Sequence, residues 1–447
     1  MRKLFLIFLF WPTLLSAFLY EPPPVHREEL PSGIKLFLTQ DPEFPTVEIL
    51  FHFVGGSIED PKGKEGLSAL MMEGIRSGGT STRRPEEIEE ELDFIGAVIE
   101  ASVDPEFRTL SLKILKKDLE KGLEILFDLV RNPAFDPERF EITRERLKES
   151  LNREEEEPLS LALREFPKLV YGKKSVWGRR ANLKSVSKIS WEDLVRFCGQ
   201  TIGPNRLVIA ASGDVTPVEI GRLIKIRTAD WLPPGKLPPP LPPLKKNFKE
   251  ERFLLNRPGL SQSTIVAGHL GEKRTNPDKF ALIVMDHILG GSGALTSRLG
   301  ESIRIEGGQA YSVWSDYTFA AEPGLFYAVA QTESAHTDDV LEKIIGTIRG
   351  IASGVRPEEL ERAKKAILSS FFFHYESRFN LARDTVRFHL WGYPEDYISR
   401  YQVEIERLTA EDIKRVAGGY LHPDRMKILV IGSEYRPLPR RFKEWKR

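Results

Sequence analysis

The residues best suited to chemistry stand in one run of the second half of the chain. The run I-L-G-G-S-G-A-L-T-S-R-L-G-E-S-I-R-I-E-G-G-Q-A-Y-S-V contains Gly290, Gly291 and Gly293, followed by Arg304 and Tyr311, which are seven residues apart. A guanidinium and a phenol can donate hydrogen bonds to a substrate carbonyl and to the oxyanion that develops from it. Glycines lack a Cβ, so their backbone amides can come close to a peptide chain. Taken singly, these residues could also be a flexible turn, a surface cation and a half-buried aromatic ring.

The histidines do not form a metal-binding pattern. The eight histidines are scattered, with none between His52 and His269, and no pair shows ligand spacing apart from the chance neighbourhood of His374 and Glu376. Ordinary core or surface positions explain them. The single cysteine, Cys198, cannot form an internal disulfide, so packing must hold the fold together. We therefore expect no metal or other cofactor in this chain.

Two segments with the same sequence signals indicate a duplicated domain. In each, a hydroxyl residue followed three residues later by aspartate marks a helix start, because the hydroxyl can accept a hydrogen bond from a free backbone amide. These signals begin at Ser190 and Thr409, and each stands sixteen residues before an arginine, Arg206 and Arg425, that follows a proline by two residues.

The elements around these signals also match. Apolar runs from Leu207 to Ala211 and from Ile428 to Ile431 predict buried strands. Earlier in each half, a proline suited to a first helical turn opens a long helical stretch, Pro137 to Glu156 and Pro357 to Phe373. We expect an α+β fold with two similar domains, each a mostly antiparallel sheet with helices packed on one face.

Length and composition fit two globular domains. The chain has 447 residues, which is too long for one compact core. Its 65 basic and 65 acidic residues give no net charge, so nucleic acid is not expected as a main partner. The segment from Pro233 to Leu244 holds seven prolines and predicts an extended linker. The expected organisation is a signal peptide at 1–17, an N-terminal domain at 18–232, a linker at 233–246, a C-terminal domain at 247–435 and a basic tail at 436–447.

The first residues predict export. Two positive charges precede a short apolar run that ends in small residues, with cleavage plausible after Ala17. The run from Leu4 to Leu15 contains Pro12 and is shorter than the roughly 20 residues that span a bilayer, although an uncleaved anchor is the alternative. We expect an exported, periplasmic protein with no stable membrane span after signal removal.

The chain resembles the pitrilysin/insulinase family of zinc peptidases, which includes the mitochondrial processing peptidase and bacterial two-subunit relatives. The resemblance rests on F-V-G-G-S-I-E-D followed by E-G-L-S-A-L-M-M-E-G-I-R-S-G-G-T, and it extends over both halves and the linker. In the family, the arginine and tyrosine that match Arg304 and Tyr311 reach across a closed chamber to the substrate. The resemblance therefore implies that this pair and the nearby glycines contact a peptide.

Catalytic members carry the motif H-x-x-E-H, in which two histidines hold zinc and the glutamate takes a proton from the attacking water. Placed by the resemblance, the two histidines fall at Ala69 and Glu73, the glutamate at Met72 and the distal ligand at Thr143. Ala69 has no donor atom, Met72 cannot act as a base, and Glu73 alone cannot hold zinc. The resemblance thus implies a degenerate metal site.

Ordinary packing also explains this helix. Four apolar residues recur at helical spacing and would face the core: Leu67, Leu70, Met71 and Ile75. On the other face, Glu73 and Arg76 have the spacing of a solvated ion pair.

The combined prediction is a non-catalytic subunit of a heterodimeric zinc peptidase. A homologous partner with an intact H-x-x-E-H motif would bind the zinc, and this chain would close the chamber and contact a peptide or unfolded-protein substrate in trans. One alternative is a peptide-binding or scaffolding protein with no peptidase partner, which could be a homodimer. Another is an enzyme with a relocated metal site.

Overall fold

The computed structural model describes residues 20–234, 242, 244, 249–291, 293–433 and 442–445. The expected signal peptide at 1–17 lies outside these residues, as do most of the linker at 233–246 and most of the tail at 436–447. Within the described ranges, no helix is both long enough and apolar enough to cross a membrane.

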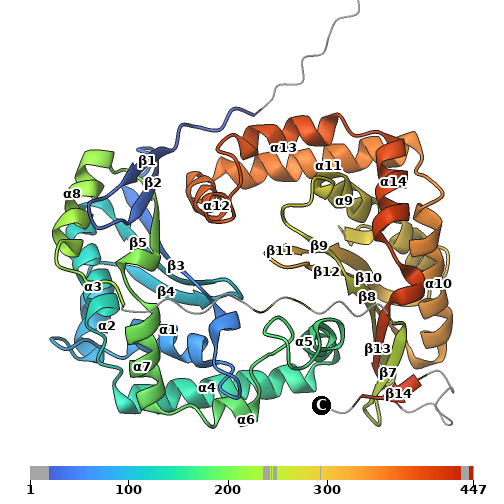
Figure 1. Cartoon of the computed structure of the whole chain (residues 1–447), viewed down its shortest axis with the longest axis horizontal. Helices are drawn as coiled ribbons and strands as arrows, with labels where there is room; N and C mark the ends of the chain where they lie inside the picture. The colour runs from blue at the N-terminus through green and yellow to red at the C-terminus, as the bar shows by residue number, and fades with distance from the viewer. Residues whose placement is uncertain are drawn as a thin grey trace, which may run out of the picture.

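Two six-stranded sheets face each other across the molecule (Figure 1). The first has the order β1-β2-β6-β3-β5-β4 and the second the order β10-β12-β8-β13-β7-β14. The strands of the first sheet are β1 (His26–Glu29), β2 (Lys35–Gln40), β3 (Thr46–Val54), β4 (Val98–Val103), β5 (Phe107–Leu115) and β6 (Leu207–Gly213). Those of the second are β7 (Glu251–Asn256), β8 (Gln262–Leu270), β10 (Ala310–Tyr317), β12 (Leu325–Glu333), β13 (Lys427–Gly432) and β14 (Phe442–Glu444).

The two sheets share one topology. The order β4-β5-β3-β6-β2 in the first corresponds to β10-β12-β8-β13-β7 in the second. In both, the three pairings of the first four strands are antiparallel and the fourth pairing is parallel. The last strand differs, because β1 joins antiparallel and β14 joins parallel to β7. The predicted α+β fold with a duplicated, mostly antiparallel sheet is confirmed.

The two predicted buried strands are central strands packed on both faces. In β6, Leu207 and Ile209 belong to the core of the first half, whereas Val208 and Ala210 face the opposite side of the sheet. Strand β13 repeats the arrangement. Burial on both faces explains why these strands have continuous apolar runs rather than an alternating pattern.

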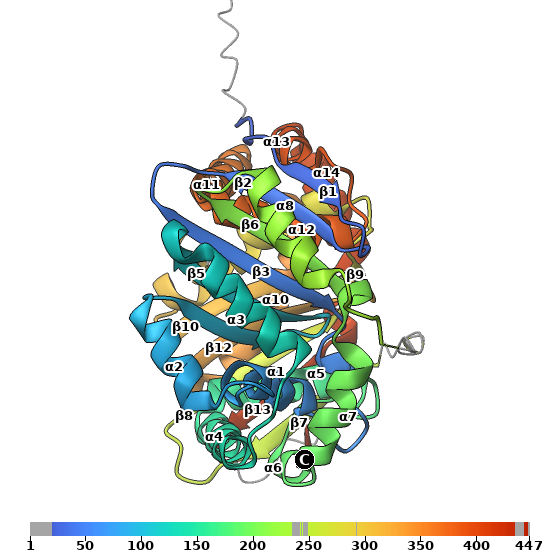
Figure 2. The same ribbon diagram turned by 90° about the vertical axis from the view of Figure 1, so that its left-hand side faces the viewer.

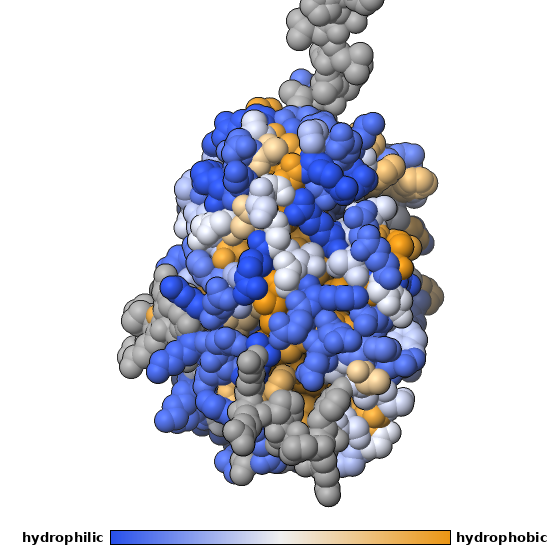
Figure 3. All heavy atoms as spheres, turned by 90° about the vertical axis from the view of Figure 1, so that its right-hand side faces the viewer, coloured by the Kyte–Doolittle hydropathy of each residue, from blue (hydrophilic) through white to orange (hydrophobic). Residues whose placement is uncertain are grey.

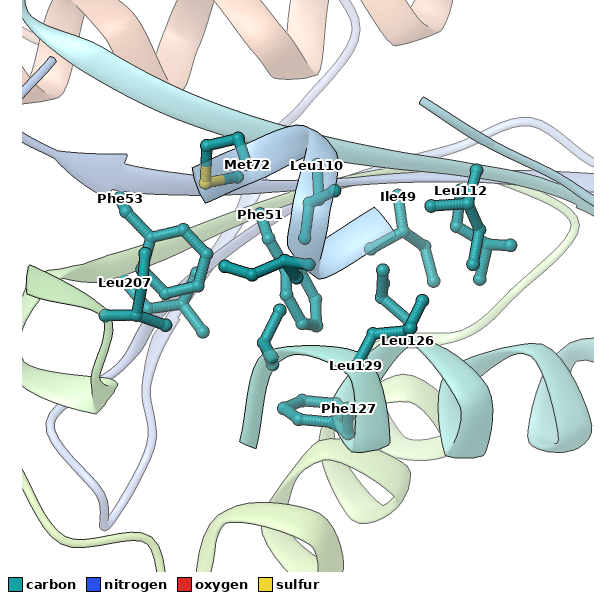
Figure 4. Packing of buried hydrophobic residues seen from close by; sticks show 14 of the residues in the cluster. Ile49, Phe51, Phe53, Met72, Leu110, Leu112, Leu126, Phe127, Leu129 and Leu207 are labelled. Carbon is teal, nitrogen blue, oxygen red and sulfur yellow. The ribbon is translucent and has the colours of Figure 1, made fainter. Parts of the chain in front are cut away.

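Helices of each half cover one face of its own sheet. Figure 2 shows α3 and α8 in front of the first sheet. Figure 4 shows part of the core, where Phe51 of β3 points toward Phe127 of α3 and Phe53 of β3 lies beside Leu207 of β6. The helices of the first half are α1 (Leu67–Ser77), α2 (Pro85–Phe94), α3 (Leu119–Arg131), α4 (Pro137–Glu156), α5 (Pro158–Tyr171), α6 (Leu183–Val186), α7 (Trp191–Thr201) and α8 (Pro217–Thr228). Those of the second are α9 (Lys279–Asp286), α10 (Thr337–Ile351), α11 (Pro357–Glu376), α12 (Arg378–Leu390), α13 (Tyr397–Glu406) and α14 (Ala410–Tyr420).

The opposite face of each sheet is covered by a helix from the other half. Helix α5 packs Leu161 and Phe166 against Val329 of the second sheet. Reciprocally, α12 packs Ala382 and Val386 against the first sheet. Figure 1 shows α4 leading to α5 along the bottom of the molecule, while α12 lies at the top beside the first sheet. Each half therefore completes the core of the other.

The predicted helix starts are confirmed. Ser190 and Thr409 are the N-caps of α7 and α14, and each forms a reciprocal capping box with the aspartate three residues on. The predicted long helices are α4, with the expected bounds, and α11, which continues three residues further to Glu376. The outer face of the second half is mostly hydrophilic, with narrow apolar strips between the polar side chains (Figure 3).

Candidate functional site

A buried polar network fixes the beginning of α1. The helix starts after Gly66, whose φ of 105° is a left-handed conformation that favours glycine. The carboxylate of Asp60 accepts hydrogen bonds from the amides of Gly66 and Ser68 at 2.7 and 2.9 Å and from Ser68 Oγ at 2.6 Å. A carboxylate at a helix N-terminus also interacts favourably with the helix dipole. Burial raises the pKa of Asp60, and this effect is larger than the lowering caused by the hydrogen bonds.

Arg108 anchors the same network inside the first half. Its side chain is fully buried, and its Nη1 lies 2.9 Å from Glu59 Oε2 while its Nε donates to Ser68 Oγ at 3.1 Å. Arg206 binds the other oxygen of Glu59 at 2.6 Å. The carboxylate of Glu59 is thus shared by two guanidiniums, and this rigid support sets the orientation of α1.

The residues at the expected metal-site positions meet in one pocket. Ala69, Met72 and Glu73 of α1 and Thr143 of α4 all line a pocket of about 340 Å³, together with residues of the edge strand β4. The register placed by resemblance therefore brings the four positions together, including Thr143 some seventy residues later in the chain. We call this cavity the α1 pocket.

The side chains of the α1 pocket do not fit zinc. Met72 is buried and belongs to the core of the first half (Figure 4). Glu73 forms the expected ion pair with Arg76, whose Nη2 lies 2.5 Å from its Oε1. Arg146 also lines the pocket, and its positive charge opposes a dication. Among the described residues, no group of three or more His, Cys, Asp or Glu side chains is placed to hold a metal ion.

The glycine-rich segment forms two π-helical turns, His287–Gly291 and Gly300–Ile305. A Cβ at Gly290 would lie 2.7 Å from Leu299 Cδ1 and 2.9 Å from the backbone nitrogen of Ser315, and one at Gly291 would overlap the carboxylate of Asp286. Close packing within the chain thus explains two of the glycines. Gly293 has φ +62° and a nearly open surface, so it alone leaves free space beside the backbone.

Asp286 is a buried acid beneath the glycine-rich segment that the sequence pattern did not reveal. Its Oδ1 accepts a hydrogen bond from Ser315 Oγ at 2.7 Å. Burial raises the pKa of Asp286 to about 7, and nearby Asp316 adds to this effect. Asp286 lies five residues before Gly291. A π turn brings two residues at this spacing close together, whereas the period of an α-helix does not.

Arg304 and Tyr311 are both exposed, on elements that position them at the edge of the second sheet. Arg304 lies near the end of the second π turn, and no described residue forms a hydrogen bond or ion pair with it. Tyr311 is 55% exposed, and its hydroxyl donates to Glu333 Oε1 at 3.3 Å. No contact joins the two side chains to each other among the described residues.

Tyr311 is the extra residue of a β-bulge. Ala310 pairs with Thr332 and Ser312 with Gln331, so Tyr311 has no partner on β12. Bulges redirect a side chain away from the regular alternation and are frequent beside binding sites. Strand β10 is the edge of its sheet, in the place that β4 occupies beside the α1 pocket. The donor pair and the α1 pocket thus occupy equivalent positions in the two halves.

His374 and Glu376 do not form a metal site. His374 Nε2 lies 2.7 Å from Asp384 Oδ2, and this contact joins α11 to α12. The buried histidines His52 and His269 contact Thr109 and the carbonyl of Leu270 respectively. Structural roles thus account for these histidines.

Two family models match the chain. The model for insulinase, peptidase family M16, matches residues 35–176. The model for the peptidase M16 inactive domain matches residues 188–367. The first match contains α1 and the α1 pocket, and the second contains the glycine-rich segment with Arg304 and Tyr311.

Known proteins resemble the chain over most of its length. An uncharacterised zinc protease of Rickettsia bellii is 26% identical over 76% of this chain and 82% of its own length. The mouse mitochondrial-processing peptidase subunit beta is 25% identical over 83% of this chain and 77% of its own. The crystal structure of a peptidase M16 inactive domain from Pseudomonas fluorescens has a TM-score of 0.83 at 21% identity, covering 92% of this chain and 98% of that one.

Proposed function

The chain belongs to the insulinase family, peptidase family M16, and we propose that it is the non-catalytic subunit of a heterodimeric zinc peptidase. A homologous partner with a complete H-x-x-E-H motif would supply the zinc, the water and the base. This chain would close the chamber and present Arg304 and Tyr311 to a peptide held over the partner's zinc.

One contrast carries the proposal. The α1 pocket keeps its position and a volume of about 340 Å³, but its side chains are an alanine, a buried methionine, a paired glutamate and a threonine. In the other half, Arg304 is exposed with no ion pair to a described residue, and Tyr311 is exposed at a bulge of β10. The α1 pocket thus lacks groups for hydrolysis, whereas the second half keeps two hydrogen-bond donors. This combination is expected of a chain that assists hydrolysis in the active site of a partner.

The expected substrate is a peptide or an unfolded segment. An exposed sheet edge can add an extended peptide as a further strand through main-chain hydrogen bonds. Strands β4 and β10 are such edges, and Tyr311 lies on β10. Gly293 has free space at its backbone and could admit the peptide there, whereas Gly290 and Gly291 would act by shaping the segment.

We also propose that the chain works in the periplasm after export, on the strength of its N-terminal sequence. There it would meet its partner subunit and its peptide substrates. The zinc of the complex would reside in the partner.

Reconstitution tests the proposal. The chain is purified from its source, any co-purifying subunit with an H-x-x-E-H motif is produced separately, and hydrolysis of a quenched fluorescent peptide is measured for each chain and for the mixture. We expect this chain alone to be inactive and zinc-free, and the mixture to be much more active than the partner alone. Peptide hydrolysis by this chain alone would overturn the proposal. A homodimer that binds peptides without any zinc subunit would favour the scaffolding alternative.

A further inference from the structure

A cavity of about 400 Å³ lies between the two halves, away from both the α1 pocket and the donor pair. We call it the interdomain cavity. It lies between the loop that joins β4 to β5, helix α5, β11 (Phe319–Ala320) and the end of α12. Its walls include Phe166, Trp177, Arg180, Phe319, Arg387 and Trp391. Both exchanged helices therefore contribute to it, and its size is typical of a small-molecule site at a domain interface.

Two arginines of the interdomain cavity have no acidic partner among the described residues. Arg180, in the loop after α5, donates through Nη1 to the carbonyls of Trp177 and Arg179, both at 2.8 Å. Arg387 of α12 places its Cζ 4.9 Å from the ring centre of Trp391. Neither guanidinium forms an ion pair with a carboxylate in the described part of the chain. Burial in the cavity wall lowers the pKa of Arg180, because it disfavours the charged form of the guanidinium.

Neighbouring arginines differ from these two. Arg274 also lies over Trp391, with Cζ 4.7 Å from the ring centre, and it forms an ion pair with Glu106 across the two halves. Arg383 lies one turn before Arg387 and binds Asp384 at 3.1 Å. A buried charge is stable when a counter-charge and hydrogen bonds compensate it. Within the described residues, the protein supplies a counter-charge to these neighbours and not to the two cavity arginines.

The two acidic side chains in the cavity wall, Asp104 and Glu106, already have partners within the protein. Asp104 Oδ1 accepts hydrogen bonds from the amides of Glu106 and Phe107 at 2.7 and 2.8 Å, within its own turn. Glu106 is the partner of Arg274. The uncommitted charges of the cavity are therefore positive, and most of the surrounding wall is aromatic or aliphatic.

We propose that the interdomain cavity binds an organic anion, a carboxylate attached to an aromatic or apolar body, with the carboxylate between Arg180 and Arg387. Guanidinium groups bind carboxylates through charge-assisted hydrogen bonds, and the aromatic walls bury the apolar body. The two arginines come from different halves, so the ligand ties the halves together. A free aromatic acid and the C-terminus of a peptide both have this chemistry.

Calorimetry on the purified full chain tests the site with matched pairs of probes. 3-Phenylpropionate is compared with its neutral amide, and the dipeptide Ala-Phe with its C-terminal amide. We expect at least one acid to bind at least about tenfold more tightly than its amide. Binding of 3-phenylpropionate identifies a free acid as the source, and binding of Ala-Phe alone identifies a peptide end. Equal affinity of both acids and their amides, or no binding of either acid, would overturn the proposal.

Variants assign the binding to the cavity. Arg180→Gln and Arg387→Gln should each weaken the acid at least about tenfold and leave the amide unchanged. Arg222→Gln is the control, because Arg222 is exposed on α8, outside the cavity, and its loss changes the net charge equally. Thermal melting of each variant confirms folding, and Arg180→Lys, which keeps the charge, should restore part of the affinity. Acid binding that survives both glutamine substitutions would refute the site. No partner subunit and no peptidase activity enter these measurements, so a failure leaves the proposed function untouched.

Discussion

The guanidinium of Arg76 donates hydrogen bonds to Glu73, with the Arg76 Nε atom 3.0 and 3.1 Å from the two carboxylate oxygens. Among the described residues, Glu73 is the one acidic side chain that lines the α1 pocket. Its carboxylate is already paired with Arg76. On the helix where the resemblance places the zinc motif, this salt bridge occupies the acidic side chain. The pair raises the pKa of Arg76, and the hydrogen bond that Arg76 donates to Glu73 is the main cause.

Rebuilding the ligand set should restore zinc binding. In the variant A69H/E73H/T143E, the two imidazoles stand four residues apart on α1 and the new carboxylate faces them from α4 across the α1 pocket. We expect about one zinc per chain after dialysis, by atomic absorption, and none in the wild-type chain. A variant that folds and stays zinc-free would show that Thr143 does not point at the α1 positions.

Removing one donor of the pair should reduce hydrolysis by the assembled complex. Each of Arg304→Gln and Tyr311→Phe removes a hydrogen-bond donor, and losing one oxyanion donor costs on the order of 100-fold in kcat. Size-exclusion chromatography should still show the complex, since neither side chain supports the fold. The control is Arg362→Gln, an exposed arginine on α11 of the same half. Turnover at the wild-type rate in both variants would rule out the assigned role.

Arg108 should be among the residues most important for stability. Arg108→Met leaves Glu59 with one guanidinium and Ser68 without a donor, in a fully buried place. Breaking a buried ion pair by removing one partner costs about 3–5 kcal/mol, which urea unfolding can measure. Lys113→Met on the same strand removes an exposed ion pair with Glu48 and should cost less than about 1 kcal/mol. A similar cost for both variants would contradict the buried network.

Asp286 should make stability depend on pH. Burial raises the pKa of this carboxyl from 3.8 to about 7, so the folded state keeps a proton that the unfolded chain releases. The contribution of Asp286 is complete below pH 3.8 and is lost as the pH rises through about 7, with a slope of up to about 1.4 kcal/mol per pH unit. Unfolding of Asp286→Asn and of the wild-type chain is compared at pH 4.5, 6 and 8. The variant should gain relative to the wild-type chain as the pH rises, and a constant difference would exclude the raised pKa.

Local patterns predicted the repeated elements because each depends on neighbours in the sequence. The capping boxes at Ser190 and Thr409 form within four residues, and the run from Leu207 to Ala211 is apolar because β6 is buried on both faces. The ion pair of Glu73 with Arg76 likewise follows from helical spacing.

Features that depend on distant pairing could not be predicted. Phe166 of α5 packs on the sheet of the other half, a contact that the residues around it in the sequence do not indicate. The bulge at Tyr311 arises from the register of β10 against β12, which is set by whole strands. Asp286 meets Gly291 through a π turn, a spacing that a regular helical pattern does not contain.

The exchange of α5 and α12 has a consequence for how this polypeptide can be cut and evolve. A fragment produced by cleavage at the proline-rich segment would expose one apolar face of its sheet to water. It would also carry an apolar helix whose packing partner lies on the other fragment. We expect neither piece to fold as a monomer, and we expect the two to recombine when they are mixed. The duplicated halves therefore form one cooperative folding unit rather than two domains that can fold independently.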